Sequence, residues 1–250
     1  MNIIKVMNMI KPGWYVLVAL LIYCLITTVG WQRSERTLRA FRDSVSSAAV
    51  SASGLLASEA VENSDDKVPL WFPIPGASLP KDTFLPGSSL PQSRRGVRQG
   101  FEFYGSSAGV PIVYGAPTVA ATDAIVIRAD EDFVELSEEA WRVLELELAL
   151  RPPNEEERDA LRGRQVWLRT DDGRTLRYAH LSATELSVGE RVRQGEVVGY
   201  IGNSGTYDGV MNSTRGPRLG FEVWQNEHYF GQNLASTELR AAASNLFAGR

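Results

Sequence analysis

The sequence predicts a mainly β fold, an antiparallel β-sandwich or barrel-sandwich domain with a small helical insert, preceded by one transmembrane helix and a short helical stalk. Three observations support this expectation. Short strand-like runs alternate with glycine turns after residue 100, helical spacing interrupts them once, and residues 14–31 carry no charge. A chain of 250 residues is long enough to bury a core of this size.

The composition restricts the function. A formal net charge of −4 argues against a dedicated nucleic-acid-binding protein, which needs a basic surface. Cys24 is the single cysteine, so the chain forms no intrachain disulfide. His180 and His228 are the two histidines, too few for a histidine-rich metal site.

Residues 14–31 are expected to be the transmembrane helix, after a cytoplasmic segment over residues 1–13. Trp14 and Trp31 mark the ends of an apolar run about one bilayer thick. A cleaved signal peptide is the alternative, although the run is long for that role. The bulky Tyr23 argues against lipid attachment at Cys24. Basic residues flank both ends, so charge does not decide the orientation.

Residues 32–62 are expected to form the helical stalk, because Leu38, Phe41 and Val45 recur at helical spacing. A homodimer through the stalk stays open, although the rest of the apolar seam is rich in alanine and would pack weakly, which favours a plain stalk. A polar linker over 63–68 leads into the β domain.

The β domain is expected over residues 69–234, and a helix or tail over 235–250. The expected strands are 101–104, 111–114, 118–120, 124–128, 165–170, 175–180, 197–201 and 219–224. Between them an acidic insert over 131–162 predicts two helices, 137–150 and 155–162, separated by Pro152 and Pro153.

Five motifs follow one another in this domain: PLWFPIPG at 69–76, GVRQGFEFY at 96–104, YAHLS at 178–182, VGERVRQGEVVGYIGNSGT at 188–206 and GPRLGFEVW at 216–224. Together they resemble the LytM/lysostaphin-type zinc endopeptidases of peptidoglycan. The resemblance covers roughly residues 69–234 and implies the β fold of that family.

The resemblance also implies that the zinc site is lost. The family binds zinc through the His and Asp of H-x-G-x-D and the second His of H-L-H-F-E. Arg98, Glu102 and Gly220 stand at those three positions in this sequence, and Arg218 replaces a catalytic histidine. Only His180 keeps the family residue, so we expect no metal and no cofactor.

The former zinc pocket is expected to become a binding groove that includes Arg98, Glu102, His180, Asn203 and Arg218. The two arginines are expected to pair with Glu102 inside the pocket, because a buried carboxylate needs a partner. They could instead reach outward to a carboxylate of a stem peptide or a partner protein. The turn around Asn203 fits a plain turn equally well, and the loop over 206–215 could cap the groove or be a solvated insertion.

The resemblance implies a catalytically inactive regulator of cell-wall hydrolysis. Degenerate members of the family bind and activate separate peptidoglycan hydrolases, such as amidases, or localise them at division sites. We therefore expect a single-pass protein of the bacterial inner membrane with its C-terminal domain in the periplasm or outside. Its expected partner is peptidoglycan or a peptidoglycan hydrolase.

Two other functions remain open at the level of sequence. A peptidoglycan metalloendopeptidase would need an atypical metal site, rebuilt with His180 or His228. The run VGERVRQGEVVGYIG at 188–202 is also typical of lipoyl-like domains in membrane-fusion adaptors of transport complexes. Against the adaptor, the insert is shorter than the helical hairpins of such proteins. Against the rebuilt metal site, a surface or loop-packing role is preferred for His228.

Overall fold

The computed structural model describes residues 68–90, 96–232 and 234–249, all within the compact unit that spans 64–250. Its helices are η1 (Asp82–Phe84), α3 (Glu138–Leu150), α4 (Glu155–Arg162), α5 (Tyr207–Val210) and α6 (Ser236–Leu246). Its strands are β1 (Phe101–Tyr104), β2 (Pro117–Val119), β3 (Ala124–Ala129), β4 (Val166–Thr170), β5 (Thr175–Ala179), β6 (Leu181–Ala183), β7 (Arg191–Val192), β8 (Val197–Ile201), β9 (Arg218–Gln225) and β10 (His228–Tyr229). The expected mainly β fold with a few helices is confirmed.

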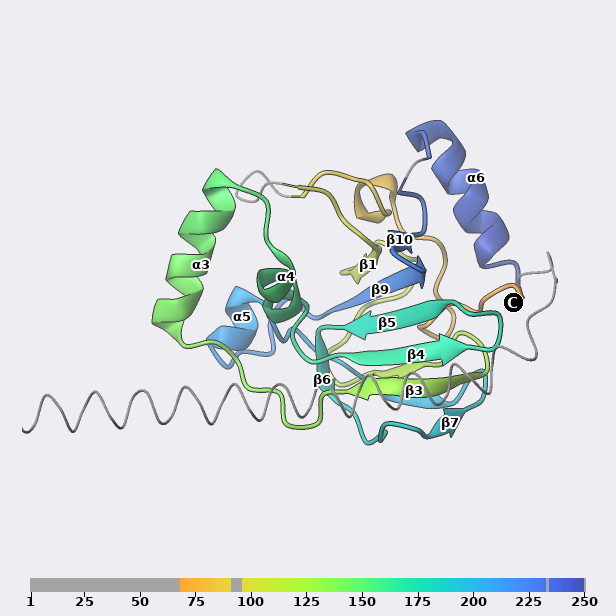
Figure 1. Ribbon diagram of the computed structural model, residues 1–250, viewed down its shortest axis with the longest axis horizontal. Coiled ribbons are helices and arrows are strands. Elements are labelled where there is room, and N and C mark those ends of the chain that lie inside the picture. The colour runs from red at the N-terminus through yellow and green to blue at the C-terminus, as the bar shows by residue number, and fades with distance from the viewer. Residues whose placement is uncertain (1–67, 91–95, 233, 250) are drawn as a thin grey trace, which may run out of the picture. The chain divides into compact units, whose positions relative to one another are not determined.

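Two antiparallel sheets make up the domain. The larger has seven strands in the order β1-β9-β5-β4-β3-β7, with β10 also paired to β9, and the smaller has the order β2-β8-β6. Figure 1 shows α3, α4 and α5 gathered at one end of the strands, at the left, and α6 at the upper right. The eight-residue β9 is an interior strand of the larger sheet and pairs with β1 on one side and β5 on the other.

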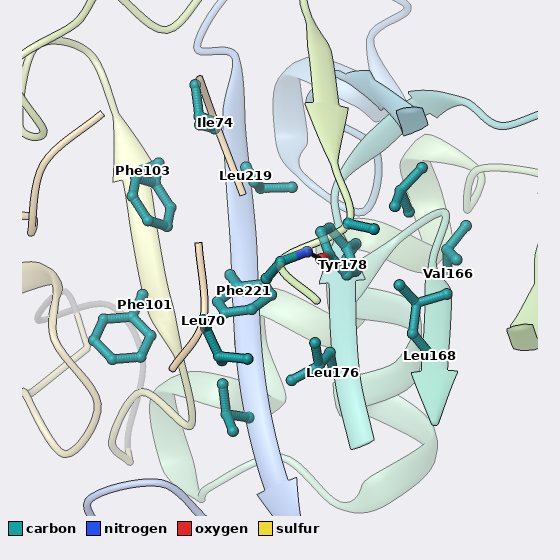
Figure 2. Close-up of a cluster of buried hydrophobic side chains, with 14 of the residues drawn as sticks. Leu70, Ile74, Phe101, Phe103, Val166, Leu168, Leu176, Tyr178, Leu219 and Phe221 are labelled. Carbon is teal, nitrogen blue, oxygen red and sulfur yellow. Dashed lines mark hydrogen bonds between the residues drawn. The ribbon is translucent and has the colours of Figure 1, made fainter. Parts of the chain in front are cut away.

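Alternation along the strands separates a core face from an outer face. Phe101, Phe103 and Phe221 are buried on the core face, as Figure 2 shows, together with the branched and aromatic side chains of β4 and β5. Tyr178 is fully buried, and its hydroxyl accepts a hydrogen bond of 2.9 Å from the backbone N–H of Ala121. Because successive side chains point to opposite faces, Glu102 lies on the outer face.

The helical insert forms where its caps and apolar spacing predict it. Ser137 caps α3 by accepting a hydrogen bond from the N–H of Ala140, and Asn154 forms a capping box with Glu157 at the start of α4. Gly163 ends α4 in a positive-φ conformation that suits glycine. Both predicted helices of the insert are thereby confirmed.

The strand expected over residues 111–114 is wrong. Pro111 has no N–H to donate, and the N–H of Ile112 bonds to the carbonyl of Gly105, so this segment forms a loop. The other seven expected strands match β1–β5, β8 and β9 to within one or two residues. The short strands β6, β7 and β10 were not expected.

The C-terminal helix packs into the same core as the strands. Leu239, Ala243 and Phe247 belong to the main buried cluster, and the ring of Phe247 stacks on Phe72 at 4.4 Å between centroids. The compact domain therefore continues past residue 234, where the β domain was expected to end.

Within the described residues, no helix has the length and apolar character needed to cross a bilayer. The transmembrane helix expected over 14–31 and the stalk expected over 32–62 lie outside the described residues.

Candidate functional site: a groove over the outer face of the large sheet

A groove of about 490 Å³ lies over β1 and β9 on the outer face of the large sheet. The antiparallel register places Glu102 directly opposite Gly220, and both residues line the floor. The walls come from η1 and the segment after it, from the insert and from α5. Their apolar members are Phe84, Leu90, Val97, Leu148, Pro153, Leu161 and Tyr207.

Glu102 binds two arginines at the floor of this groove. Arg98 Nη1 forms an ion pair with one carboxylate oxygen, and Arg218 Nη1 lies 3.1 Å from the other. Glu102 is 8% exposed, so the carboxylate has lost most of its hydration and needs both guanidinium groups. The expected internal pairing of these three residues is confirmed.

Each of the two arginines also stacks on an aromatic ring. The Arg98 guanidinium lies 5.4 Å from the ring centre of Phe84, and that of Arg218 lies 4.9 Å from the ring centre of Tyr104. Burial lowers the pKa of Arg218 from its ordinary value, while Asp208 and Tyr104 oppose the shift. The rings and the carboxylate together fix both guanidinium planes.

His180 lies at the same floor and is held by the backbone. Its φ of 64° is left-handed, and its Nδ1 is 2.8 Å from the carbonyl oxygen of Ser204. Since a carbonyl oxygen can only accept, Nδ1 carries a proton in this arrangement. A Cβ placed on Gly220 would lie 3.4 Å from Cδ2 of the His180 ring, so Gly220, where the resemblance implies a zinc ligand, faces this histidine.

Arg98, Glu102 and Gly220, which stand where the resemblance implies zinc ligands, do not fit a zinc ion. A guanidinium has no lone pair to offer, Gly220 has no side chain, and both oxygens of Glu102 are engaged by arginines. Among the described residues, no group of three His, Cys, Asp or Glu side chains could hold a metal. His228 lies in β10, is exposed and does not line the groove.

A second cluster of the same composition, which the sequence analysis missed, lies beside the first. Glu222 on β9 accepts a hydrogen bond of 2.8 Å from Arg162 Nε and is 3.5 Å from Arg177 Nη1. The guanidinium of Arg177 is sandwiched between the rings of Trp167 and Trp224, at 4.0 and 4.3 Å. The alternation in GFEVW, which puts Gly220, Glu222 and Trp224 on one face, was the available signal.

Gly100 allows the two clusters to lie close together. A Cβ on Gly100 would lie 2.7 Å from Cγ of Glu222, so a larger residue would displace that carboxylate. Gln99 next to it accepts a hydrogen bond of 2.8 Å from Arg162 Nη2. The segment before β1 and the end of α4 are thereby joined across the floor.

Asn203, expected in the groove, has a different position. It is buried, and its side-chain amide donates to the carbonyls of Ser213 and Arg215 at 2.6 and 2.8 Å. These bonds hold the loop over 206–215 in place, and Tyr207 and Asp208 from that loop line the groove. Asn203 therefore positions a wall of the groove and does not line it.

Charges in the lining balance. Four arginines (Arg98, Arg158, Arg162 and Arg218) face four acidic residues (Glu102, Glu145, Asp208 and Glu222). A charge-balanced floor under apolar walls suits a peptide-like ligand with mixed character better than a strongly charged one.

Comparison with known proteins identifies one segment of the chain. Residues 154–231 match the model of peptidase family M23. This segment runs from the start of α4 to just past β10 and contains His180, Arg218, Gly220 and Glu222. No protein of curated function matches the sequence.

Three solved structures are similar to this chain at low identity. A zinc-containing peptidase from Vibrio cholerae is 18% identical, with a TM-score of 0.40 over 65% of this chain and 39% of that one. The catalytic domain of lysostaphin from Staphylococcus simulans is 18% identical, with a TM-score of 0.37 over 58% of this chain and 83% of that one. LytU is 19% identical, with a TM-score of 0.38 over 68% of this chain and 86% of that one.

Proposed function

We propose that this chain is a peptidoglycan-related protein that binds a ligand in its groove and does not cut it, since residues 154–231 match the model of peptidase family M23. The ligand is peptidoglycan or a separate peptidoglycan hydrolase, which the chain activates or scaffolds. The observation that carries this proposal is the Arg98–Glu102–Arg218 cluster of ion pairs. The resemblance puts Arg98 and Glu102 at two of the three zinc-ligand positions and Arg218 at a catalytic histidine.

The shape and chemistry of the groove support binding. Its volume of about 490 Å³ lies within the range of ligand sites, and its walls are apolar over a floor of fixed charges. Catalysis of the family's kind would need an open metal position with three protein ligands, which these residues do not supply.

The proposal extends to the place of action. The charge-free segment 14–31 supports a single-pass anchor in the bacterial inner membrane, with the domain in the periplasm or outside. The chain would then act on the cell wall close to the membrane.

The test combines binding, activation and metal content. The full-length purified chain should co-sediment with peptidoglycan or accelerate wall digestion by an added hydrolase, and it should contain well under one zinc per chain. Tyr207→Ala removes an exposed groove residue and should weaken the effect, whereas Tyr114→Ala, outside the groove and also exposed, should not.

Three results would contradict this function. Stoichiometric zinc together with wall cleavage by the chain alone would favour an endopeptidase with an atypical site. Absence of both binding and activation would contradict the regulatory role. Equal effects of Tyr207→Ala and Tyr114→Ala would show that the groove is not the binding site.

A further inference from the structure

Helix α3 has an apolar face that the domain does not cover. Val143, Leu146 and Leu150 are 58%, 71% and 78% exposed, the largest such stripe on one helix among the described residues. Surface apolar residues are common singly, but three aligned on one helix face mark an interaction surface more often than chance. We call these three residues the α3 stripe.

The α3 stripe is separate from the face that holds the helix in place. Trp141, Leu144 and Leu148 are the buried residues of α3. With 100° between successive residues, these two sets of three lie on nearly opposite sides of the helix. The helix is therefore apolar on two faces, and only one of them packs against the domain.

The stripe is about two turns long. Its residues are spaced by three and four, and seven residues of helix span about 10 Å. This is the pattern by which one amphipathic helix packs along another, with apolar residues at the same spacing on the partner.

The charge around the stripe identifies the partner's chemistry. Residues 138–162 hold eight acidic residues against four arginines, an excess as large as the net charge of −4 for the whole chain. Glu139 of α3 is exposed, whereas Glu138 and Glu147 are half-buried and form ion pairs with Arg142 and Arg151. The net negative charge of the insert repels a second copy of the insert and an anionic lipid surface, and it attracts a basic segment.

We propose that the α3 stripe binds a basic amphipathic helix of another protein. Its leucine- or valine-like face packs on Val143, Leu146 and Leu150, and its lysines or arginines meet Glu139 and the net negative charge of the insert. The proposal does not depend on the function of the groove, because the stripe faces away from Glu145 and Leu148, the α3 residues that line it.

The test is photocrosslinking in living cells with the full-length chain. Benzoylphenylalanine in place of Leu146 should crosslink to one segment of another protein, identified by mass spectrometry of the joined peptide. That segment should carry a net positive charge and apolar residues spaced by three and four. The same label in place of Val188, which is 62% exposed in a different part of the domain, is the control and should not capture it.

A charge in the stripe should abolish the contact without unfolding the domain. Leu150→Glu is expected to lower the crosslink yield at position 146 about tenfold, and Val188→Glu to leave it unchanged. The proposal is overturned by no crosslink above the Val188 control, by crosslinks to a second copy or to lipid, or by a captured segment that is acidic or lacks helical spacing. Equal yields in Leu150→Glu and the unsubstituted chain would also overturn it.

Discussion

Single residues at the groove floor show how buried charge is organised in this domain. Glu102 and Glu222 lie on the paired strands β1 and β9, and each carboxylate contacts two arginines. Removing a carboxylate leaves two desolvated guanidinium groups without a counter-charge. The resulting loss in the free energy of unfolding is larger than the net stabilisation from the ion pairs themselves. The floor is consequently sensitive to the loss of either acid.

Glu102→Ala should lower the free energy of unfolding by about 3 kcal/mol, and Glu102→Gln should cost less because the amide keeps an acceptor of the same shape. Denaturant unfolding of the full-length chain measures both values. Glu139→Ala, an exposed glutamate on α3, is the control and should change stability by less than about 0.5 kcal/mol.

A double-mutant cycle that combines Glu102→Ala with Arg98→Ala measures the interaction energy between these two side chains. Glu102 and Arg98 should show a coupling energy of about 1 kcal/mol or more. Additive effects would mean that the two side chains act independently and that the arginine serves a ligand in the groove.

At the level of elements, the turn at Gly163 and the turn at Gly205 approach each other so closely that neither glycine tolerates a side chain. A Cβ on Gly205 would lie 2.6 Å from the carbonyl oxygen of Ala160 and in contact with Gly163, and Gly205 has a φ of +67°. The hydroxyl of Ser204 accepts a hydrogen bond from the N–H of Arg164 across the same contact. The turn at 202–205 thus joins the end of α4 to the strand β8.

Gly205→Ala should destabilise the domain by at least about 2 kcal/mol, because it adds a clash with backbone to the cost of the left-handed conformation. Gly173→Ala separates the two causes. Gly173 also has a positive φ, of +81°, but nothing lies within 4 Å of its Cβ position, so about 1 kcal/mol is expected. Thermal unfolding compares the two variants, and equal losses would contradict the packing argument.

The start of α4 should give the domain a measurable acid sensitivity. Hydrogen bonds from Arg151 and from the backbone N–H of Asn154 lower the pKa of Glu157 from 4.5 to about 2. Since the pKa is lower in the folded state, this stabilisation is fully present above pH 4.5 and is lost as the pH falls toward 2.

Glu157→Gln should therefore be less stable than the unsubstituted chain near neutral pH, with a difference that shrinks below pH 4.5. Unfolding curves from pH 7 downward measure it. Glu156 lies on the same helix but is not part of the capping box. Glu156→Gln therefore makes the same charge change and should show no comparable pH dependence. A difference that stays constant with pH would refute the assignment.

For the molecule as a whole, α6 closes the core from the end of the chain. The ring of Phe247 stacks on Phe72 and packs edge-on against Phe101 at 5.1 Å, joining the first described segment, β1 and the C-terminus. A backbone hydrogen bond joins the same two segments: the N–H of Leu70 donates to the carbonyl of Leu246 at 2.7 Å. Both ends of the domain depend on this contact.

Phe247→Ala should cost about 3 kcal/mol, the price of an aromatic side chain removed from a packed core. Thr237→Ala, exposed on the same helix, is the control and should be nearly neutral. A chain ending at residue 234 should fail to give a cooperative unfolding transition. Retention of full stability by that shorter chain would show that the core does not need α6.

The sequence by itself determined the features that depend on neighbours in the chain. Apolar spacing and the caps at Ser137 and Asn154 located α3 and α4, and alternation located seven of the strands. The resemblance to the LytM/lysostaphin-type family brought Arg98, Glu102 and Arg218 to one place, and charge pairing then predicted their contact.

Only the tertiary structure decided features whose partners are distant in the chain. Arg162 and Glu222 are 60 residues apart, and no local pattern joins the end of α4 to β9. The two-residue strands β7 and β10 exist because β3 and β9 offer them hydrogen bonds, and Asn203 turned away from the groove because the carbonyls of its own loop needed a donor. Hydrogen-bond and charge partners of this kind are selected by packing, since a buried polar group must be satisfied by whatever the fold brings near it.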